Sequence, residues 1–270
     1  MHLGLIGCGN IVKTLLGFLD APDAPDVTRI TLLVRAGQCD RAQDEIAAMT
    51  PKAEIVEETA DLIAARPDLI VEAAGHAGVA EHVGPCLEAG FDVVVVSVGA
   101  LSDTDLAARL ETAARAGGAR IILPAGAVGG IDIVSALSAS GEVTLTYRGT
   151  KPPKAWAGSP AAEALDLDTL ESAAVFFTGT AREAAAQFPK NANVAATLAL
   201  AGPGLDKTRV ELVADPAAPG NVHSYEVVSP AAKVRVEIEN LPSNGNAKTS
   251  VATIYSVLRE IRNHIGPMVI

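Results

Sequence analysis

The residues HLGLIGCGNI, at positions 2–11, decide the fold of the first half of the chain. A short apolar run, residues 3–6, is followed by two glycines in a Gly-x-Gly turn and then by residues 10–19, whose apolar positions have helical spacing. A strand, a glycine turn and a helix in this order form the part of a doubly wound sheet that holds a dinucleotide pyrophosphate. The stretch therefore predicts a dinucleotide site near the N-terminus, with an ordinary strand-to-helix turn as the alternative.

Each residue of the turn has a distinct expected role. Gly7 allows the tight bend, and Gly9 lets the backbone approach the pyrophosphate, which then meets the N–H groups of Asn10 and Ile11 at the helix N-terminus. The third position of the glycine fingerprint is Val12, a departure that predicts a wider contact between helix and strand.

Working outward, strands and helices alternate up to residue 125. The expected strands are residues 3–6, 30–34, 54–56, 69–73, 93–98 and 120–123, and the expected helices are residues 10–19, 42–49, 79–89 and 104–116. Strands that are apolar on both faces and separated by helices predict a parallel sheet with both faces covered. The fold class is therefore α/β, with an N-terminal Rossmann-like doubly wound sheet.

The pattern changes after residue 125. Strands are expected at residues 143–148, 175–178, 210–214, 223–228 and 233–239, with helices only at residues 182–187 and 194–201. Consecutive strands predict an α+β domain with a mainly antiparallel sheet. We expect a dinucleotide-binding domain over 1–125, a substrate domain over 126–245, and a C-terminal part, 246–270, whose helix at 248–263 packs back on the first domain.

Composition narrows the classes of function. The 270 residues carry a formal net charge of −11, which argues against a nucleic-acid partner. The longest apolar run is far shorter than the ~18 residues that a membrane span needs, and no signal peptide is evident. Three widely spaced cysteines and no metal-like motif indicate free thiols in a reducing cytoplasm and predict no metal site.

Several loops at the carboxyl ends of the expected parallel strands are candidates for ligand contacts. The second strand ends in Arg35 where an acidic residue usually binds the ribose of NAD, so we expect NADP to be accepted at least as well as NAD, unless Arg35 is a solvated surface residue. The small residues of loops 74–76, 97–100 and 124–130 permit close approach of a nicotinamide, or are glycines of ordinary turns.

In the second half, His223 is the histidine best placed for general acid/base work, because its pKa can lie near neutral pH. A histidine satisfied within the core or at the surface is the alternative. Asn193 follows a polar turn and either caps the next helix or holds a carboxamide.

The chain resembles a known family, the short L-aspartate dehydrogenases associated with NAD biosynthesis. The resemblance covers nearly the whole length, and its FPKNANVAATL and NVH segments are more specific than the glycine turn. The matching stretches are GCGNI at 7–11, EAAGH at 72–76, VVSVGALSD at 95–103, LPAGAVGGID at 123–132, YRGTKPPKAW at 147–156, GTAREAAAQFPKNANVAATLALAG at 179–202, DPAAPGNVHSYEV at 215–227 and NAKTS at 246–250.

The resemblance implies oxidative deamination of L-aspartate, through iminoaspartate, to oxaloacetate and ammonia, with NAD or NADP reduced. It places the active-site histidine at His223 and cofactor contacts at Ala127 and Asn193. Family members commonly have glycine or alanine where this chain has Val12, which bears on pyrophosphate affinity. We also expect a homo-oligomer, a dimer, with no membrane or nucleic-acid partner.

The two carboxylates of L-aspartate need cationic or hydroxyl partners. The candidates are Lys190, Lys248, Thr249 and Ser250, each of which has solvation or helix capping as an alternative role. The preference of carboxylates for arginine would add Arg148, whose place the sequence does not determine.

Two functions of other classes stay open. An imine reductase of the dihydrodipicolinate reductase type would share the two-domain architecture, but its basic, histidine-rich motif is not found in the second domain. A nucleotide sensor without catalysis would bind NAD or NADP but would not turn over aspartate.

Overall fold

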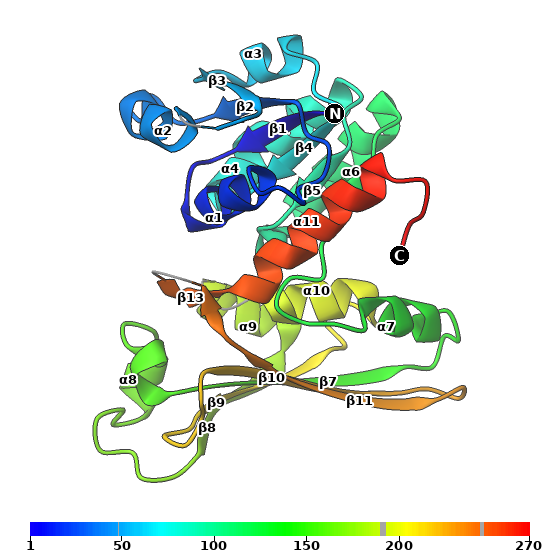
Figure 1. The fold of residues 1–270 in the computed structure, drawn as a ribbon. Coiled ribbons are helices and arrows are strands. Elements are labelled where there is room, and N and C mark those ends of the chain that lie inside the picture. Colours follow the sequence, from blue (N-terminus) through cyan, green and yellow to red (C-terminus); the bar gives the residue numbers. More distant parts are fainter. Residues whose placement is uncertain (48, 190–192, 244–245) are drawn as a thin grey trace. The chain divides into compact units, whose positions relative to one another are not determined.

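The structure is a computed structural model, and it describes residues 1–47, 49–189, 193–243 and 246–270. The chain divides into two compact units (Figure 1). Unit 1 comprises Met1–Pro124 and Ile254–Ile270, and unit 2 comprises Ala125–Thr253. Residues 246–253, which the sequence groups with the C-terminal helix, thus belong to unit 2.

Unit 1 is built on a six-stranded sheet, sheet A, in which every pair of neighbouring strands is parallel. The strand order is β3-β2-β1-β4-β5-β6, so the chain reverses direction across the sheet next to β1. This order confirms the predicted Rossmann-like fold. The strands are β1 (His2–Ile6), β2 (Arg29–Leu33), β3 (Lys52–Val56), β4 (Leu69–Glu72), β5 (Val93–Val95) and β6 (Ile121–Ile122).

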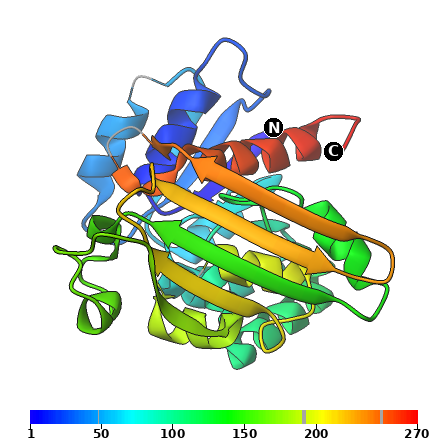
Figure 2. The same ribbon diagram turned by 90° about the horizontal axis from the view of Figure 1, so that it is seen from below.

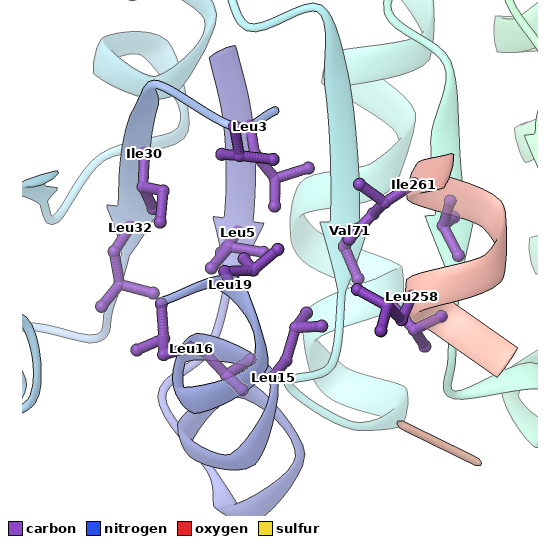
Figure 3. Close-up of a cluster of buried hydrophobic side chains, with 14 of the residues drawn as sticks. Leu3, Leu5, Leu15, Leu16, Leu19, Ile30, Leu32, Val71, Leu258 and Ile261 are labelled. Carbon is purple, nitrogen blue, oxygen red and sulfur yellow. The ribbon is translucent and has the colours of Figure 1, made fainter. Parts of the chain in front are cut away.

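Helices cover both faces of sheet A because its strands are apolar on both sides. On one face, Leu15 and Leu19 of α1 and Leu258 and Ile261 of α11 pack against Leu5 and its neighbours from β2 and β4 (Figure 3). On the other face a second cluster joins the strands to α3, α5 and α6. The C-terminal helix, 130 residues away from the rest of unit 1 in the sequence, therefore completes the core of the nucleotide fold.

The helices expected in unit 1 are present with different ends, and further short helices and turns lie between them. They are α1 (Asn10–Leu19), α2 (Cys39–Ile46), α3 (Thr59–Ala64), α4 (His76–Gly78), a π-helical turn η1 (Val79–Val83), α5 (Gly84–Glu88), a 3₁₀ turn η2 (Val98–Ser102), α6 (Thr104–Gly117) and α11 (Val251–Ile265), whose first turn belongs to unit 2. The short α3 was not predicted. The strand expected over 93–98 ends at Val95, because Glu72 binds the backbone N–H of Ser97 and turns the chain away from the sheet.

Unit 2 contains a five-stranded sheet, sheet B, in the order β11-β10-β7-β9-β8. Three of its four strand pairs are antiparallel and only β7 and β9 run parallel, which confirms the predicted mainly antiparallel sheet. The strands are β7 (Thr144–Lys151), β8 (Ala174–Thr180), β9 (Arg209–Ala214), β10 (Asn221–Val228) and β11 (Lys233–Asn240).

One face of sheet B is apolar and carries the helices of unit 2, as the alternation along β7 and β10 dictates. Leu145, Tyr147 and Val227 are buried on it, whereas Arg148 and Glu226 lie on the opposite face. Figure 2 looks onto that opposite face, where no described helix of unit 2 lies in front of the strands. The helices are α7 (Ile131–Ser138), η3 (Pro153–Trp156), α8 (Ala161–Ala164), α9 (Ala181–Gln187) and α10 (Asn193–Ala201).

The end of unit 2 corrects one prediction. The helix expected over 248–263 begins only at Val251, and the residues before it form β13 (Asn246–Ser250), which pairs with β12 (Pro242–Ser243). Ser250 ends the strand and starts the helix, since its hydroxyl accepts a hydrogen bond from the Ala252 backbone N–H at 3.1 Å.

Candidate active site

A cavity of about 440 Å³ lies in unit 1 at the carboxyl ends of β1, β2 and β4. This is where ligands bind in open α/β sheets. Its walls include the backbone of the predicted dinucleotide turn, the end of β2 and the loop after β4; the lining residues are Ile6, Gly7, Cys8, Gly9, Asn10, Lys13, Leu33, Val34, Arg35, Gln38, Arg41, Ala73, Ala74, Ala77, Gly78, Glu81 and His82.

The two glycines of the turn are required for different reasons. Gly7 has φ +97°, and a Cβ there would lie 3.0 Å from the Ala74 backbone, so the fold itself needs this glycine. Gly9, in contrast, has open space where its Cβ would be, with no atom within 4 Å. Space kept clear in front of the α1 N-terminus fits a pyrophosphate, so the residues present suit a nicotinamide dinucleotide.

Two arginines line the wall of this cavity that the segment after β2 forms. Arg35 lies two residues after the end of β2, and Arg41 lies in the first turn of α2; both are exposed. Within the described parts of the chain, neither forms an ion pair with a carboxylate. The sequence singled out Arg35 but missed Arg41, because only the position of α2 beside β2 brings the second arginine to the same wall.

Glu72, which the sequence did not select, organises the carboxyl ends of β4 and β5. It is fully buried at the last residue of β4. Its carboxylate accepts hydrogen bonds from the backbone N–H groups of Ala74 and Gly75, at 2.7 and 3.0 Å, and from both the N–H and the hydroxyl of Ser97. Burial raises the pKa of Glu72 against the effect of these bonds. Glu72 thus holds two of the predicted ligand loops in shape.

The glycine-rich loop at residues 124–130 is held by sheet B within unit 2. Asn240, buried at the end of β11, donates to the Ala127 carbonyl at 2.9 Å. The Tyr225 hydroxyl donates to the Gly129 carbonyl at 2.6 Å. Ala127, the predicted cofactor contact, therefore lies on a loop with a fixed backbone.

His223 is the third residue of β10 and lies on the helix-covered face of sheet B, and only 6% of it is exposed. Its Nδ1 is 2.7 Å from the Tyr147 hydroxyl of β7. Tyr147 reaches His223 across Gly149, which is paired with His223 in the sheet. A Cβ at Gly149 would lie 2.6 Å from the tyrosine hydroxyl, so only glycine leaves room for this bond.

Lys151 lies on the same face of β7 as Tyr147. Burial lowers the pKa of its ammonium to about 8, and the ammonium lies 4.9 Å from the centre of the Trp156 ring. Burial, and then the charge of Lys151, lower the pKa of His223 to about 4. Burial raises the pKa of Tyr147, so its hydroxyl stays protonated. At neutral pH His223 is therefore an uncharged imidazole next to a phenol and a cation.

The Tyr147, Lys151 and His223 cluster was only partly predicted. The stretch YRGTK alternates Tyr147, Gly149 and Lys151 on one strand face, a signal that was available in the sequence. The register that pairs this face with His223 joins residues more than 70 positions apart, and the sequence alone does not reveal it.

The remaining predicted site residues do not belong to the cluster around His223. Ser250 donates to Asn240, so its hydroxyl supports the site framework. Arg148 lies on the face of sheet B opposite His223 and is paired with Glu211 at 2.7 Å, which removes it from the candidates. Asn193 is exposed at the start of α10, Lys248 and Thr249 lie in β13, and Lys190 lies outside the described residues.

The described residues contain neither a metal-binding cluster nor a membrane-spanning helix. They contain no group of three or more His, Cys, Asp or Glu side chains arranged to hold a metal ion. None of their helices is long and apolar enough to span a membrane.

Comparisons with known proteins agree on the family. Residues 132–264 match the family described as aspartate dehydrogenase, C-terminal, and residues 7–124 match the NAD binding domain of homoserine dehydrogenase. An L-aspartate dehydrogenase of Cupriavidus necator is 44% identical over 263 residues, covering 97% of both chains.

Solved structures show the same fold. The crystal structure of aspartate dehydrogenase from Thermotoga maritima superimposes with a TM-score of 0.75 at 26% identity, covering 100% of this chain and 99% of that one. A dihydrodipicolinate reductase from Paenisporosarcina has a TM-score of 0.54 at 11% identity, covering 98% and 95%, which reflects the shared fold alone. With a nucleotide cavity in one unit, a buried histidine cluster in the other, and this similarity over nearly its whole length, the chain belongs to the L-aspartate dehydrogenase family.

Proposed function

We propose that this protein oxidises L-aspartate with NAD or NADP to iminoaspartate, which is hydrolysed to oxaloacetate and ammonia. The observation that carries the proposal is the buried, neutral imidazole of His223, held through Nδ1 by Tyr147, in a chain 44% identical to an L-aspartate dehydrogenase. Unit 1 binds the dinucleotide, and unit 2 supplies the acid/base group.

The residues of unit 2 serve the proton transfers of this reaction. When bound, the nicotinamide accepts the hydride that leaves Cα. The substrate amine has to be neutral for that step, and the resulting imine then has to be attacked by water. His223 accepts the proton of the attacking water and returns it to the departing ammonia, so that no net proton stays on the imidazole.

Tyr147 suits a histidine that both takes and returns a proton. A hydroxyl is a donor and an acceptor, and it can follow either tautomer of the ring without leaving Nδ1 unpaired. With Nδ1 held, Nε2 is the nitrogen left for the proton transfers. Because Tyr147 is buried and its pKa is raised, it does not compete for the proton.

For the cofactor, we propose that NADP is accepted at least as well as NAD. Arg35 and Arg41 line the same wall of the cavity, and no carboxylate lies between the end of β2 and Asp40 to bind the ribose of NAD. A 2′-phosphate placed there meets two guanidinium groups, whose planar N–H pairs match phosphate oxygens. Gly7, Gly9, Asn10 and Ile11 bind the pyrophosphate in this proposal, and Ala127 and Asn193 contact the cofactor as the family resemblance implies.

The experiment is an absorbance assay at the reduced-nicotinamide band, with L-aspartate, L-glutamate and L-alanine tested against NAD and NADP. We expect L-aspartate to be used far better than the other two, because a fixed pocket pairs two carboxylates at one spacing. Similar kcat/KM for aspartate and alanine would exclude a second carboxylate pocket. Nucleotide binding without turnover of any amino acid would instead indicate a nucleotide sensor that has no catalytic activity.

We propose that the protein forms a homodimer. Sedimentation velocity of the purified protein measures the assembly, and a single species of 27.6 kDa would contradict it.

A further inference from the structure

Lys151 occupies an unusual position for a lysine. It lies on the helix-covered face of β7, on the strand next to His223, and its side chain is mostly buried. A surface lysine keeps its ammonium in water, but this one gives up most of its hydration, as the lowering of its pKa shows. Its position brings a cation to the face of sheet B on which His223 lies.

The surroundings hold the ammonium in place. It lies over the face of Trp156, whose ring nitrogen donates to the Val213 carbonyl at 3.0 Å. Phe176 packs against the indole edge to face, at 4.8 Å between ring centres. The indole is thus fixed on two sides, and cation–π attraction directs the lysine to one location.

We propose that Lys151 binds one of the two carboxylates of the substrate beside His223. The role presupposes the proposed function. Two of the candidates named from the sequence have other partners, since Arg148 lies on the far face of the sheet and the Ser250 hydroxyl is bonded to Asn240. An ammonium has three N–H donors, and a carboxylate accepts charge-assisted hydrogen bonds from such a group.

The carboxylate also changes His223. The titratable groups that face it from the described elements are Tyr147, which stays neutral, and Lys151, whose charge opposes protonation of the imidazole. A carboxylate bound at Lys151 offsets that charge and raises the pKa of His223 from about 4 towards the working pH. The substrate would therefore make the histidine a better base when it binds.

The test uses succinate, a dicarboxylate without an amine, so that its binding reports only groups of the protein. Its dissociation constant is measured by calorimetry between pH 6.5 and 9.5, with and without NAD, on the wild type and on Lys151→Met. Lys154→Met removes the same charge from an exposed position three residues away and is the matched control. Lys151→Arg keeps the charge and moves its titration far above pH 9.5.

We expect wild-type binding to weaken above pH 8, as Lys151 loses its proton. Lys151→Met should bind succinate roughly ten- to hundredfold more weakly, the value of one charge-assisted hydrogen bond, and without that pH dependence. Lys154→Met should match the wild type, and Lys151→Arg should bind without weakening up to pH 9.5. Nuclear magnetic resonance should show that succinate raises the pKa of His223 in the wild type but not in Lys151→Met.

Three results would overturn the assignment. The first is a folded Lys151→Met that binds succinate as the wild type does. The second is loss of kcat in that variant with succinate affinity intact, which would make Lys151 a base. The third applies if Lys151→Met does not fold: weakening near pH 8 in Lys151→Arg would then attribute the titration to another group. Because turnover of aspartate by the wild type is measured separately, failure of the proposed function remains distinguishable.

Discussion

The nucleotide cavity of unit 1 and the histidine cluster of unit 2 are built in opposite ways. The cavity is built around the glycine turn between β1 and α1, which are consecutive in the sequence, and its other walls come from the segments after β2 and β4, with arginines exposed on one wall. The cluster consists of buried side chains from two strands that the register brings together. A site that binds its ligand through backbone groups tolerates most side-chain changes, except a Cβ at a glycine that the ligand or the chain approaches closely. A site that acts through side chains depends on each functional group.

The largest expected effect tests the side-chain site. Asparagine can replace His223 in size and hydrogen bonding but cannot carry a proton near neutral pH. His223→Asn should lower kcat by ~10²–10⁴, the usual contribution of a positioned acid/base, with nucleotide affinity unchanged. Steady-state kinetics and a direct NADH-binding titration measure the two quantities.

The pH profile separates proton transfer from positioning in the same variant. The substrate amine titrates alike with both proteins, so a limb that only the wild type shows belongs to His223. That limb should lie at higher pH for kcat than for kcat/KM, because the free histidine has its pKa near 4 and bound substrate raises it. If His223→Asn keeps most of kcat and the whole profile, the histidine is structural.

The next effect tests the backbone site. Gly9→Val places a side chain in the space in front of the α1 N-terminus, where nothing of the protein lies within 4 Å. It should raise the KM of both cofactors roughly ten- to hundredfold by displacing the pyrophosphate from its charge-assisted bonds. Thermal unfolding should be nearly unchanged, in contrast to Gly7→Val, which clashes with the Ala74 backbone. Unchanged cofactor KM values in a folded Gly9→Val would place the nucleotide elsewhere.

A smaller and more selective effect concerns the arginines at the edge of the cavity. Arg35→Asp should raise the KM for NADP about tenfold or more and lower that for NAD, because an aspartate repels the 2′-phosphate and accepts from the ribose hydroxyl. Arg41→Ala should raise the KM for NADP alone. Equal KM values for NADP in the wild type and in both variants would show that these arginines are solvated surface residues.

The smallest expected effect comes from Tyr147→Phe, which removes the hydroxyl that holds His223 and keeps the ring. One neutral hydrogen bond contributes about 1 kcal/mol, so kcat should fall about fivefold, with KM for the cofactor unchanged. The acid limb that belongs to His223 should also move. Gly149→Ala should imitate this change by displacing the Tyr147 hydroxyl. A wild-type pH profile in Tyr147→Phe would show that the tyrosine only fills space.

Much of the molecule is predictable from local pattern. The Gly7 turn, the helix after it and the alternation of strands and helices up to residue 125 predict the parallel sheet, because each depends on neighbours in the sequence. Arg35 and His223 were selected for chemistry carried by single residues. The short helix α3 was missed because six residues contain too few turns for a periodic signal.

What the sequence determined by itself is therefore the class of each part: a nucleotide-binding sheet, a second sheet with one apolar face, and a histidine able to transfer protons. The tertiary structure decided which residues surround that histidine. Arg148 lies on the opposite face of sheet B, and the Ser250 hydroxyl is hydrogen-bonded to Asn240. Tyr147 and Lys151 are the residues that lie beside His223. The physical reason is register: side chains alternate between the faces of a strand, but the neighbours across a sheet depend on pairing between segments more than 70 residues apart.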